Sequence, residues 1–361
     1  MDTQRKRILI APLDWGLGHA TRCLVIIRVL QKANCDITVA ASGTIKSLIQ
    51  NEFPDLNFID LPGYNISYSK SKRTLPFKIL LQIPKILKII RFENKWLTKI
   101  SATKNFDAVI SDSRFGFYTK QVASVFVTHQ LQVKTNFFLS DTLLRHFNYR
   151  YINRFSECWV PDFADSFNVS GELSHPKALP VIPVKYLGPL SRFKNGVCNN
   201  LIKFKYITII SGPEPQRSVF EKKIFEVVSK TNDEYLIVRG LPDEINNTFH
   251  FPNCKVFNHL STNDMEEAIG HSEFIISRCG YTTVMEILSL QKKSILIPTP
   301  GQTEQEYLAQ HLLKQNWCYT FDQKDDFEFH LQKAATFKYD LPEMNMHLHE
   351  GVITDFINRL H

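Results

Sequence analysis

The sequence predicts an α/β protein made of two Rossmann-like domains that face each other across a cleft. Its 361 residues exceed the length of about 250–300 residues beyond which one hydrophobic core usually gives way to two domains. The two halves also begin alike, each with an apolar strand, a polar turn and a helix. In the second half, two further strands end in polar turns that open helices, and such turns lie side by side at the carboxyl edge of a parallel sheet.

The first half opens with a strand at residues 7–12, a turn, a helix at residues 20–32 and a second strand at residues 36–41. Apolar residues recur every three or four positions in the helix, which predicts one apolar face. This order is that of a nucleotide-binding βαβ unit. The turn carries Gly16 and Gly18 but lacks the third glycine of the dinucleotide fingerprint, so it supports NAD binding only weakly.

Strands and helices continue in alternation along the chain. In the first half we expect strands at residues 106–111, 124–128 and 158–161, a helix at residues 141–155 and a linker at residues 181–190. In the second half we expect strands at residues 206–210, 235–238, 256–260, 273–276 and 294–298, and terminal helices at residues 327–336 and 347–360. The predicted domains are residues 1–187 and 188–345, with residues 346–361 forming a helix that crosses back to the first domain.

Composition limits the class of protein. Hydrophobic residues make up 43% and charged residues 22% of the chain, which is ordinary for globular proteins. The seven cysteines form no CxxC pair, and no signal peptide precedes the first strand, so we expect a reducing cytoplasm. No apolar run reaches the length of a membrane span. A net charge of +7 is compatible with nucleotides, anionic lipid surfaces or nucleic acid, of which nucleic acid is not an expected partner.

The stretch that follows the strand at residues 273–276 predicts an anion site. It turns through Gly280 into a helix that begins with Thr282 and Thr283. The first amides of a helix have no partner inside it, and they bind anions readily. Glu286 lies on the first turns, where its carboxylate can reach hydroxyl groups, so the pattern fits a nucleotide and its ribose. An ordinary α/β turn capped by one of the threonines explains the same residues equally well.

Residues 277–287 (SRCGYTTVMEI) and 301–307 (GQTEQEY) together resemble the donor-binding signature of MurG-type UDP-N-acetylglucosamine transferases, the family 28 glycosyltransferases. The resemblance implies the glycosyltransferase B architecture. It also implies transfer of a sugar from a nucleotide donor, a UDP-sugar such as UDP-N-acetylglucosamine, with inversion. By the same resemblance Glu286 holds the ribose. The residues that it places around the donor sugar are Gln302, Glu304 and Gln305.

The loop at residues 16–22 (GLGHATR) resembles the N-terminal glycine loop of the same transferases. It also resembles the Gly-x-Gly-His-x-x-Arg loop of the nucleotide-sugar hydrolase of pseudaminic acid synthesis, in which the histidine is catalytic. A histidine at a helix N-terminus tends to stay neutral and can act as a base. We therefore expect His19 to be the base, with Asp112 as the second candidate; a helix cap or phosphate contact is the alternative role of His19. The residues expected on the acceptor side are Trp15, Arg114 and His129.

The other donor contacts are expected at the turns that end the strands. In the turn at residues 211–217 the family has glycines, whereas Pro213 and Pro215 here lack an amide hydrogen. Without a DxD motif, we expect no metal and no cofactor, and the leaving diphosphate would be stabilised by the helix start and by Arg278. The further donor-binding residues are Gly18, Ser211, Gly212, Arg217, Arg239, His259, Leu260, Gly280, Tyr281, Thr282 and Thr283.

Residues 72–100 combine eight lysines and arginines with one acid, Glu93, and many aliphatic and aromatic residues. Such a basic amphipathic stretch predicts docking on an anionic membrane. A core helix with a solvated basic face is the alternative. Pro76 and Pro84 predict that the stretch is split into two short helices, or into a helix and a loop.

Taken together, the motifs predict a glycosyltransferase of cell-envelope synthesis that moves a sugar from a nucleotide sugar to a hydroxyl of an acceptor glycan or lipid-linked sugar. We expect it in the cytoplasm, peripherally on the inner face of the membrane. Two alternatives stay open, a nucleotide-sugar hydrolase in which water replaces the acceptor, and a non-catalytic sugar-nucleotide binding protein.

Overall fold

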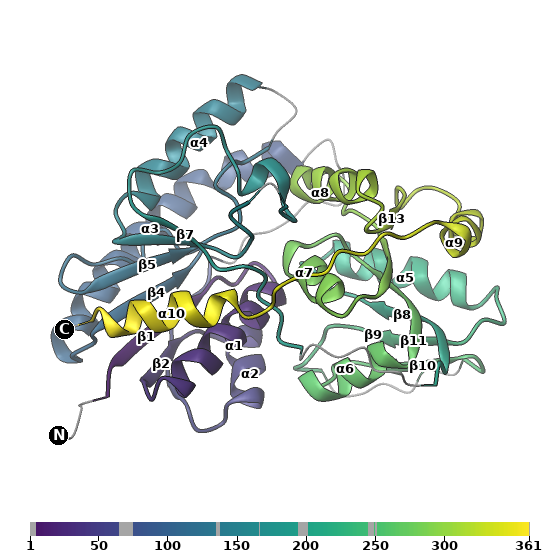
Figure 1. The fold of residues 1–361 in the computed structure, drawn as a ribbon, viewed down its shortest axis with the longest axis horizontal. Helices are drawn as coiled ribbons and strands as arrows, with labels where there is room; N and C mark the ends of the chain where they lie inside the picture. The colour runs from purple at the N-terminus through teal and green to yellow at the C-terminus, as the bar shows by residue number, and fades with distance from the viewer. Residues whose placement is uncertain are drawn as a thin grey trace.

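The chain folds into two halves, each a parallel sheet with helices on both faces (Figure 1). The computed structural model describes residues 5–64, 75–134, 138–165, 167–193, 201–244, 249 and 251–360. This arrangement confirms the predicted α/β fold with two Rossmann-like units.

Within these residues, the first half forms a seven-stranded parallel sheet in the order β3-β2-β1-β4-β5-β6-β7. Its strands are β1 (Arg7–Pro12), β2 (Asp36–Ala40), β3 (Asn57–Ile59), β4 (Ala108–Asp112), β5 (Ala123–Val127), β6 (Glu157–Val160) and β7 (Val184–Tyr186). Its helices are α1 (Leu17–Lys32), α2 (Gly43–Glu52), α3 (Leu75–Thr103), α4 (Phe138–Ile152) and a short 3-10 helix, η1 (Gly171–Leu173).

The described part of the second half forms a six-stranded parallel sheet in the order β10-β9-β8-β11-β12-β13. Its strands are β8 (Phe204–Ile209), β9 (Tyr235–Val238), β10 (Cys254–Phe257), β11 (Ser272–Ser277), β12 (Lys293–Leu296) and β13 (Tyr319–Thr320). Its helices are α5 (Gln216–Val228), α6 (Thr262–Gly270), α7 (Tyr281–Ser289), α8 (Thr303–Lys314) and α9 (Phe327–Thr336), and α10 (Leu348–Asn358) ends the chain.

The central strands are continuous apolar runs because helices cover both faces of the sheet. In β1, Ile8 and Ile10 face the core shared with α1, whereas Leu9 and Ala11 face the core under α3. The strand order reverses between β1 and β4 and again between β8 and β11, which is where open α/β sheets bind ligands. Pro12 pairs in register with Asp112, so the turn after β1 lies beside the end of β4.

The predicted break of the basic segment is wrong. Residues 75–103 form one helix, α3, with Pro84 inside it. Pro76 lies in the first turn, where a missing amide hydrogen costs no hydrogen bond. The helix continues past Pro84 because its apolar face is held over the sheet: Ile90 and Leu97 are buried. Residues 72–74 lie outside the described residues.

The predicted linker at residues 181–190 is also wrong in part, because β7 lies within it and joins the edge of the first sheet. Three buried or short elements, α2, β3 and β13, were not expected, since their sequences lack a clear period. Most other boundaries agree with the predicted ones to within a few residues, and β9 and α9 agree in full.

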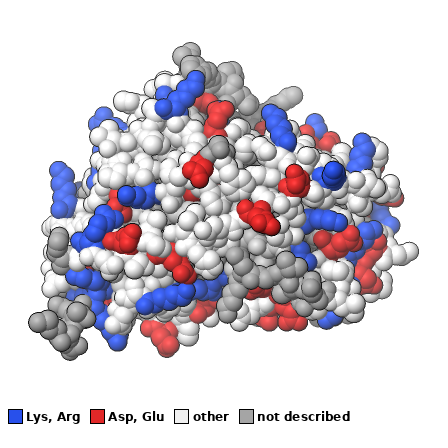
Figure 2. Space-filling model, viewed as in Figure 1, with Lys and Arg blue, Asp and Glu red and all other residues white. Residues whose placement is uncertain are grey.

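The C-terminal helix packs on the first half. Figure 1 shows the yellow C-terminal segment running from α9 to α10, which lies beside α1. Ile353, Phe356 and Ile357 enter the core around α1, and Lys32 contacts Glu350 at 2.9 Å. We propose that the domains are residues 1–187 and 188–345, with residues 346–361 returning to the first. On the face drawn in Figure 2, basic and acidic side chains are interspersed.

Candidate active site

His19 lies where the first half meets the second. It is the third residue of α1, which begins directly after the turn that follows β1. Asp112 ends β4 and is fully buried. The Nδ1 atom of His19 lies 3.0 Å from Oδ2 of Asp112. Because strand pairing places the two elements side by side, residues 93 positions apart form a histidine–aspartate pair.

The environment of the pair keeps the histidine neutral and the aspartate ionised. Burial lowers the pKa of His19, and the neighbouring Asp112 offsets only part of that effect. Burial alone would raise the pKa of Asp112, but Arg22 and His19 lower it below its usual value. A neutral imidazole that donates its Nδ1 hydrogen to a carboxylate presents a basic Nε2, which is the arrangement of a general base and its orienting acid.

The pair continues into a chain of charged groups that crosses to the second half. Arg22, one helical turn after His19, directs Nη2 to Oδ1 of Asp112 and Nη1 to Nδ1 of His129 at 3.2 Å. The Nε2 atom of His129 lies 2.6 Å from Oε1 of Glu304, at the start of α8. Sequence reasoning gave Arg22 no role, although its spacing of three residues from His19 places both on one face of α1.

The N-termini of α1 and α7 meet at this junction. The Thr282 hydroxyl donates to the carbonyl of Gly18 at 3.2 Å, and a Cβ atom at Gly18 would lie 3.1 Å from that hydroxyl oxygen. Glycine therefore allows the close approach. α7 begins after Gly280 without a side-chain cap, so the amides of its first turn, including that of Thr283, are directed toward the junction. The ring of Tyr281 is stacked on His129, with centroids 4.2 Å apart.

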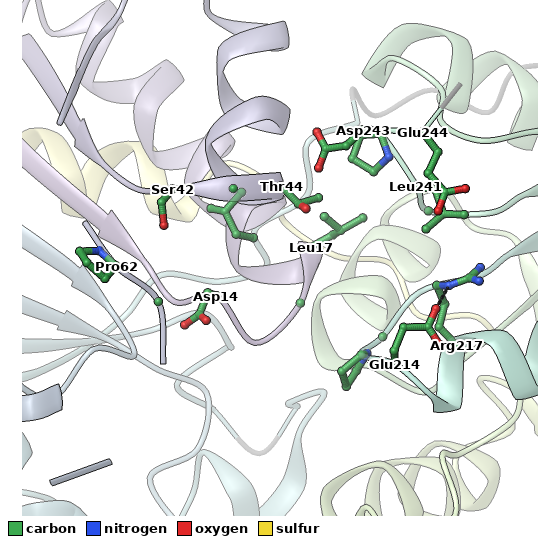
Figure 3. Close-up of a pocket in the computed structure, with 18 of the residues that line it drawn as sticks. Asp14, Leu17, Ser42, Thr44, Pro62, Glu214, Arg217, Leu241, Asp243 and Glu244 are labelled. Atoms are coloured by element: carbon green, nitrogen blue, oxygen red, sulfur yellow. Dashed lines mark hydrogen bonds and ion pairs between the residues drawn. The ribbon is translucent and has the colours of Figure 1, made fainter. Parts of the chain in front are cut away.

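A cavity of about 780 Å³ lies between the halves beside this junction (Figure 3). In the figure, Asp14, Ser42 and Pro62 approach it from the first half, whereas Leu241 and Asp243 approach it from the second. The predicted donor residues in its lining are Gly212 and Arg217; Ser211 directly precedes Gly212. The carboxylates in the lining are Asp14, Asp60, Glu214, Asp243 and Glu244.

The three arginines predicted as donor contacts are already paired inside the second half. Arg217 contacts Glu214 at 2.6 Å and Glu221 at 3.1 Å. Arg239 contacts Glu221 at 2.6 Å and Asn258 at 2.7 Å.

Arg278 is 2% exposed and donates to the carbonyls of Ile297 and Pro298. Burial lowers the pKa of Arg278 to about 9. In this structure these guanidinium groups hold loops together, because buried arginines need internal acceptors. Their donor contacts stay predictions.

Glu286 lies on α7 with its carboxylate buried, and burial raises its pKa although Arg192 opposes the effect. The Nε atom of Arg192 lies 2.9 Å from Oε1 of Glu286. Arg192 comes from the segment that connects the halves and was not predicted, because nothing in that segment marks it. His259 is partly buried, and Arg192 and Glu52 are among the charges that affect its pKa, which burial lowers. Leu260 packs against the neighbouring core.

Two of the three residues predicted to contact the donor sugar, both at the start of α8, have hydrogen-bond partners inside the protein. The side chain of Gln305 accepts a hydrogen bond from the amide of Thr299 at 2.8 Å, and Glu304 contacts His129. Gln302 precedes α8 and is partly exposed. Among the described residues, no hydrogen bond is made by the side chain of Gln302, in contrast to those of Glu304 and Gln305.

Arg114 is buried against a carboxylate of α3. It is 1% exposed and lies 3.0 Å from Oε1 of Glu93, the one acid of the basic segment. Its Nη2 donates to the carbonyl of Pro62 at 2.9 Å. In this structure the guanidinium neutralises a buried carboxylate of α3, and the acceptor-side place of Arg114 stays a prediction. Trp15 is 37% exposed next to the cavity residue Gly16.

The described ranges contain neither a candidate metal site nor a candidate membrane span. No group of three or more histidine, cysteine, aspartate or glutamate side chains there is arranged to hold a metal ion. None of the helices in these ranges combines the length and the apolarity that a membrane crossing requires.

Similarity to known proteins identifies the class of enzyme. Residues 221–344 match the model of the glycosyltransferase family 28 C-terminal domain. The chain is 24% identical over 326 residues to an uncharacterized glycosyltransferase of Methanosarcina acetivorans, covering 83% of this chain and 81% of the relative. It is 23% identical over 290 residues to the UDP-N-acetylglucosamine–N-acetylmuramyl-(pentapeptide) pyrophosphoryl-undecaprenol N-acetylglucosamine transferase of Clostridium perfringens, covering 78% and 75%. The chain is a glycosyltransferase.

Solved structures share the fold of this glycosyltransferase. MurG of Acinetobacter baumannii aligns with a TM-score of 0.53 at 14% identity, covering 98% of this chain and 99% of that one. The glycotransferase of kitacinnamycin aligns with a TM-score of 0.62 at 13% identity, covering 99% and 94%. The predicted glycosyltransferase B fold, the predicted enzyme class and the resemblance to MurG-type transferases are thus confirmed.

Proposed function

We propose that the enzyme transfers a sugar from a UDP-sugar, such as UDP-N-acetylglucosamine, to a hydroxyl acceptor, by an inverting mechanism that needs no metal ion. The observation that carries this proposal is the His19–Asp112 contact of 3.0 Å, beside the N-terminus of α7. It puts a neutral base from one half next to an anion-binding helix start from the other.

In the proposed reaction, Nε2 of His19 takes the proton of the acceptor hydroxyl. The oxygen attacks the anomeric carbon, and the bond from that carbon to the donor phosphate breaks, so that its electron pair leaves with the diphosphate. The amides at the start of α7 stabilise the new negative charge. A single displacement of this kind inverts the anomeric centre. Asp112 is fully buried and holds the imidazole in place, so we no longer propose it as a base.

The first experiment is calorimetry with a panel of nucleotides, followed by turnover of UDP-sugars with and without hydroxyl acceptors. Binding of uridine nucleotides and acceptor-dependent release of UDP are the expected results. Release of UDP that no acceptor accelerates would favour the hydrolase, whose loop the His19 segment also resembles. Nucleotide binding without turnover under any condition would contradict the transferase mechanism.

Glu286→Ala is expected to weaken UDP binding by about 1–3 kcal/mol, the range for losing hydrogen bonds to a charged group. The reason is that the Glu286 carboxylate, held by Arg192 at 2.9 Å, would accept hydrogen bonds from the ribose hydroxyls. Calorimetry measures the change. As the control ligand, 2′,3′-dideoxy-UDP should bind both proteins with the same affinity, and an equal loss for both ligands would show that the substitution acts through the fold of α7.

We also propose that the enzyme docks on an anionic membrane, on its cytoplasmic face. The name of the Clostridium perfringens transferase includes an undecaprenol-linked acceptor, which is a lipid. The structure adds exposed apolar side chains of α4 to those of the basic segment. Exposed apolar side chains are found on α3, with Leu81 at 65%, and on α4, with Leu143 at 73% and Phe147 at 43%.

The two helices share a small core. Ile90 of α3 and Tyr151 of α4 pack in one cluster, and the ring centroids of Phe147 and Tyr151 lie 5.0 Å apart. Lys85, Lys88 and Arg91 are exposed on α3. Because Glu93 is buried against Arg114, the acid of this segment does not offset its surface charge. Basic groups near apolar ones are the features that hold a protein at a lipid interface.

Reversing the charge at Lys85, Lys88 and Arg91 to glutamate is expected to abolish co-sedimentation with phosphatidylglycerol vesicles at low salt. Each basic group contributes on the order of 1 kcal/mol near an anionic surface, and salt screens the attraction. The matched control reverses three exposed lysines of the second half, Lys222, Lys230 and Lys255, and should keep binding. Equal, negligible sedimentation of the unaltered enzyme with anionic and neutral vesicles would overturn the docking proposal.

A further inference from the structure

Arg22 occupies the centre of the chain of charged groups, and the mechanism proposed above does not use it. It is 2% exposed. Its Nη2 contacts Oδ1 of Asp112 and lies 2.9 Å from Nδ1 of His19, whereas its Nη1 lies 3.2 Å from Nδ1 of His129. A buried arginine that only neutralised Asp112 would need the carboxylate alone. This one also contacts two histidines, on two different elements.

The contact with Arg22 fixes the position of the proton on a neutral His129. A guanidinium only donates hydrogen bonds, so Nδ1 of His129 must accept from Nη1. A neutral His129 then carries its hydrogen on Nε2 and donates it to Glu304, 2.6 Å away. Arg22 of the first half therefore donates to His129, and His129 donates to Glu304 of the second half.

At the other end of the guanidinium, His19 has two possible tautomers. With the hydrogen on Nδ1, His19 and Arg22 both donate to Asp112, and Nε2 of His19 is free to act as a base. With the hydrogen on Nε2, the Nδ1 atom accepts from Arg22 instead, and the base is lost. The guanidinium of Arg22 donates to His129 and to Oδ1 of Asp112, so Oδ2 of Asp112 is available to accept from His19. This arrangement favours the tautomer with the hydrogen on Nδ1 of His19.

We propose that Arg22 is a positioning residue that sets the tautomers of His19 and His129 together, so that contact of Glu304 with His129 prepares the base of the opposite half. Without Glu304, His129 can carry its hydrogen on Nδ1. Two donors, this Nδ1 and Nη1 of Arg22, would then face each other, and the contact of Arg22 with Asp112 would weaken. Approach of the two halves would thus be sensed at His19. The inference rests on the proposed role of His19, but the linkage among the side chains can be measured without any reaction.

The experiment uses the full chain labelled with ¹⁵N-histidine, without substrate, and two-bond ¹H–¹⁵N spectra that distinguish the tautomers. His19→Gln and His129→Gln assign the two rings among the 12 histidines. In the unaltered enzyme we expect the hydrogen on Nε2 of His129 and on Nδ1 of His19. A neutral His129 with its hydrogen on Nδ1 would overturn the proposal without any further variant.

The linkage itself is tested with Glu304→Ala. It should change the signals of His129, to which Glu304 is hydrogen-bonded, and also those of His19. In an Arg22→Lys background, which keeps the charge but not the two-pronged contact, Glu304→Ala should no longer affect His19. The control Arg150→Gln, an exposed site on α4, should leave both rings unchanged.

Each outcome has one meaning. If His19 does not respond to Glu304→Ala in the unaltered background, Arg22 only neutralises Asp112 and the proposal fails. That comparison needs no Arg22 variant, so it stands even if Arg22→Lys does not fold. If the linkage is present but His19→Ala still turns over substrate at the normal rate, the base role fails and the linkage remains.

Discussion

His19→Ala is expected to lower turnover by about 10²–10⁴-fold, the usual contribution of a general base. Donor affinity and melting temperature should stay close to those of the unaltered enzyme, because the side chain is at the junction surface and contacts Asp112 and Arg22 without filling a core. The measurement is kcat with saturating UDP-sugar and acceptor, beside calorimetry with UDP. Lost donor affinity with full turnover would make His19 a phosphate contact.

The pH dependence of turnover gives a second check on the same residue. Burial lowers the pKa of His19, so the neutral base persists below the ordinary value of about 6.5 and the acidic limb of the pH–rate profile should lie below it. Asp112 raises the pKa of His19, so Asp112→Asn should move this limb to still lower pH while reducing kcat. A limb that moves to higher pH in this variant would contradict the orienting role of the carboxylate.

Arg114→Met is expected to destabilise the fold by about 3–5 kcal/mol, because it leaves the carboxylate of Glu93 buried without its partner. Burial already raises the pKa of Glu93, with Arg114, the Tyr64 hydroxyl and the amide of Gly116 acting against it. Urea unfolding measures the loss. Much of the cost comes from an unpaired charge at the contact between α3 and the end of β4.

Two companion variants test that reason. Glu93→Leu combined with Arg114→Met removes both charges and should be markedly more stable than Arg114→Met alone. Lys46→Met breaks an ion pair with Asp60 of 2.8 Å whose acid is exposed, and should cost less than about 1 kcal/mol. A double variant as unstable as the single one would show that packing, and not the unpaired charge, dominates at this position.

The architecture could be predicted because each strand of a parallel sheet is an apolar run that ends in a polar turn. Residues 273–276 and 294–298 showed this clearly, and the strand at residues 7–12 did so with its glycine turn. What could not be predicted were elements held by their neighbours. α3 continues through Pro84 because the core under Leu97 holds it, and β7 exists because β6 offers it an edge.

The candidate site divides in the same way. His19 and Asp112 could be chosen from their places after β1 and at the end of β4, since parallel pairing brings such ends together. The sequence alone could not separate arginines that bind ligands from arginines that pair with buried groups. Arg114 and Arg278 follow strands just as ligand-binding residues do, yet buried acceptors take their guanidinium groups. Arg22 and Arg192 do not follow a strand, and they belong to the site because they contact Asp112 and Glu286.

The return of the C-terminal helix limits how the enzyme can move. The chain joins its halves twice, after β7 and before α10, and the two connections touch where Leu348 lies 3.0 Å from the position of a Cβ atom on Gly188. Gly188 has φ = 70°, and a larger residue would collide there. Two adjacent connections at one place favour rotation of one half relative to the other about that place, and they restrict twisting and separation. We therefore expect the halves to open and close by rotation about this contact, so that each new substrate meets the same opposed surfaces.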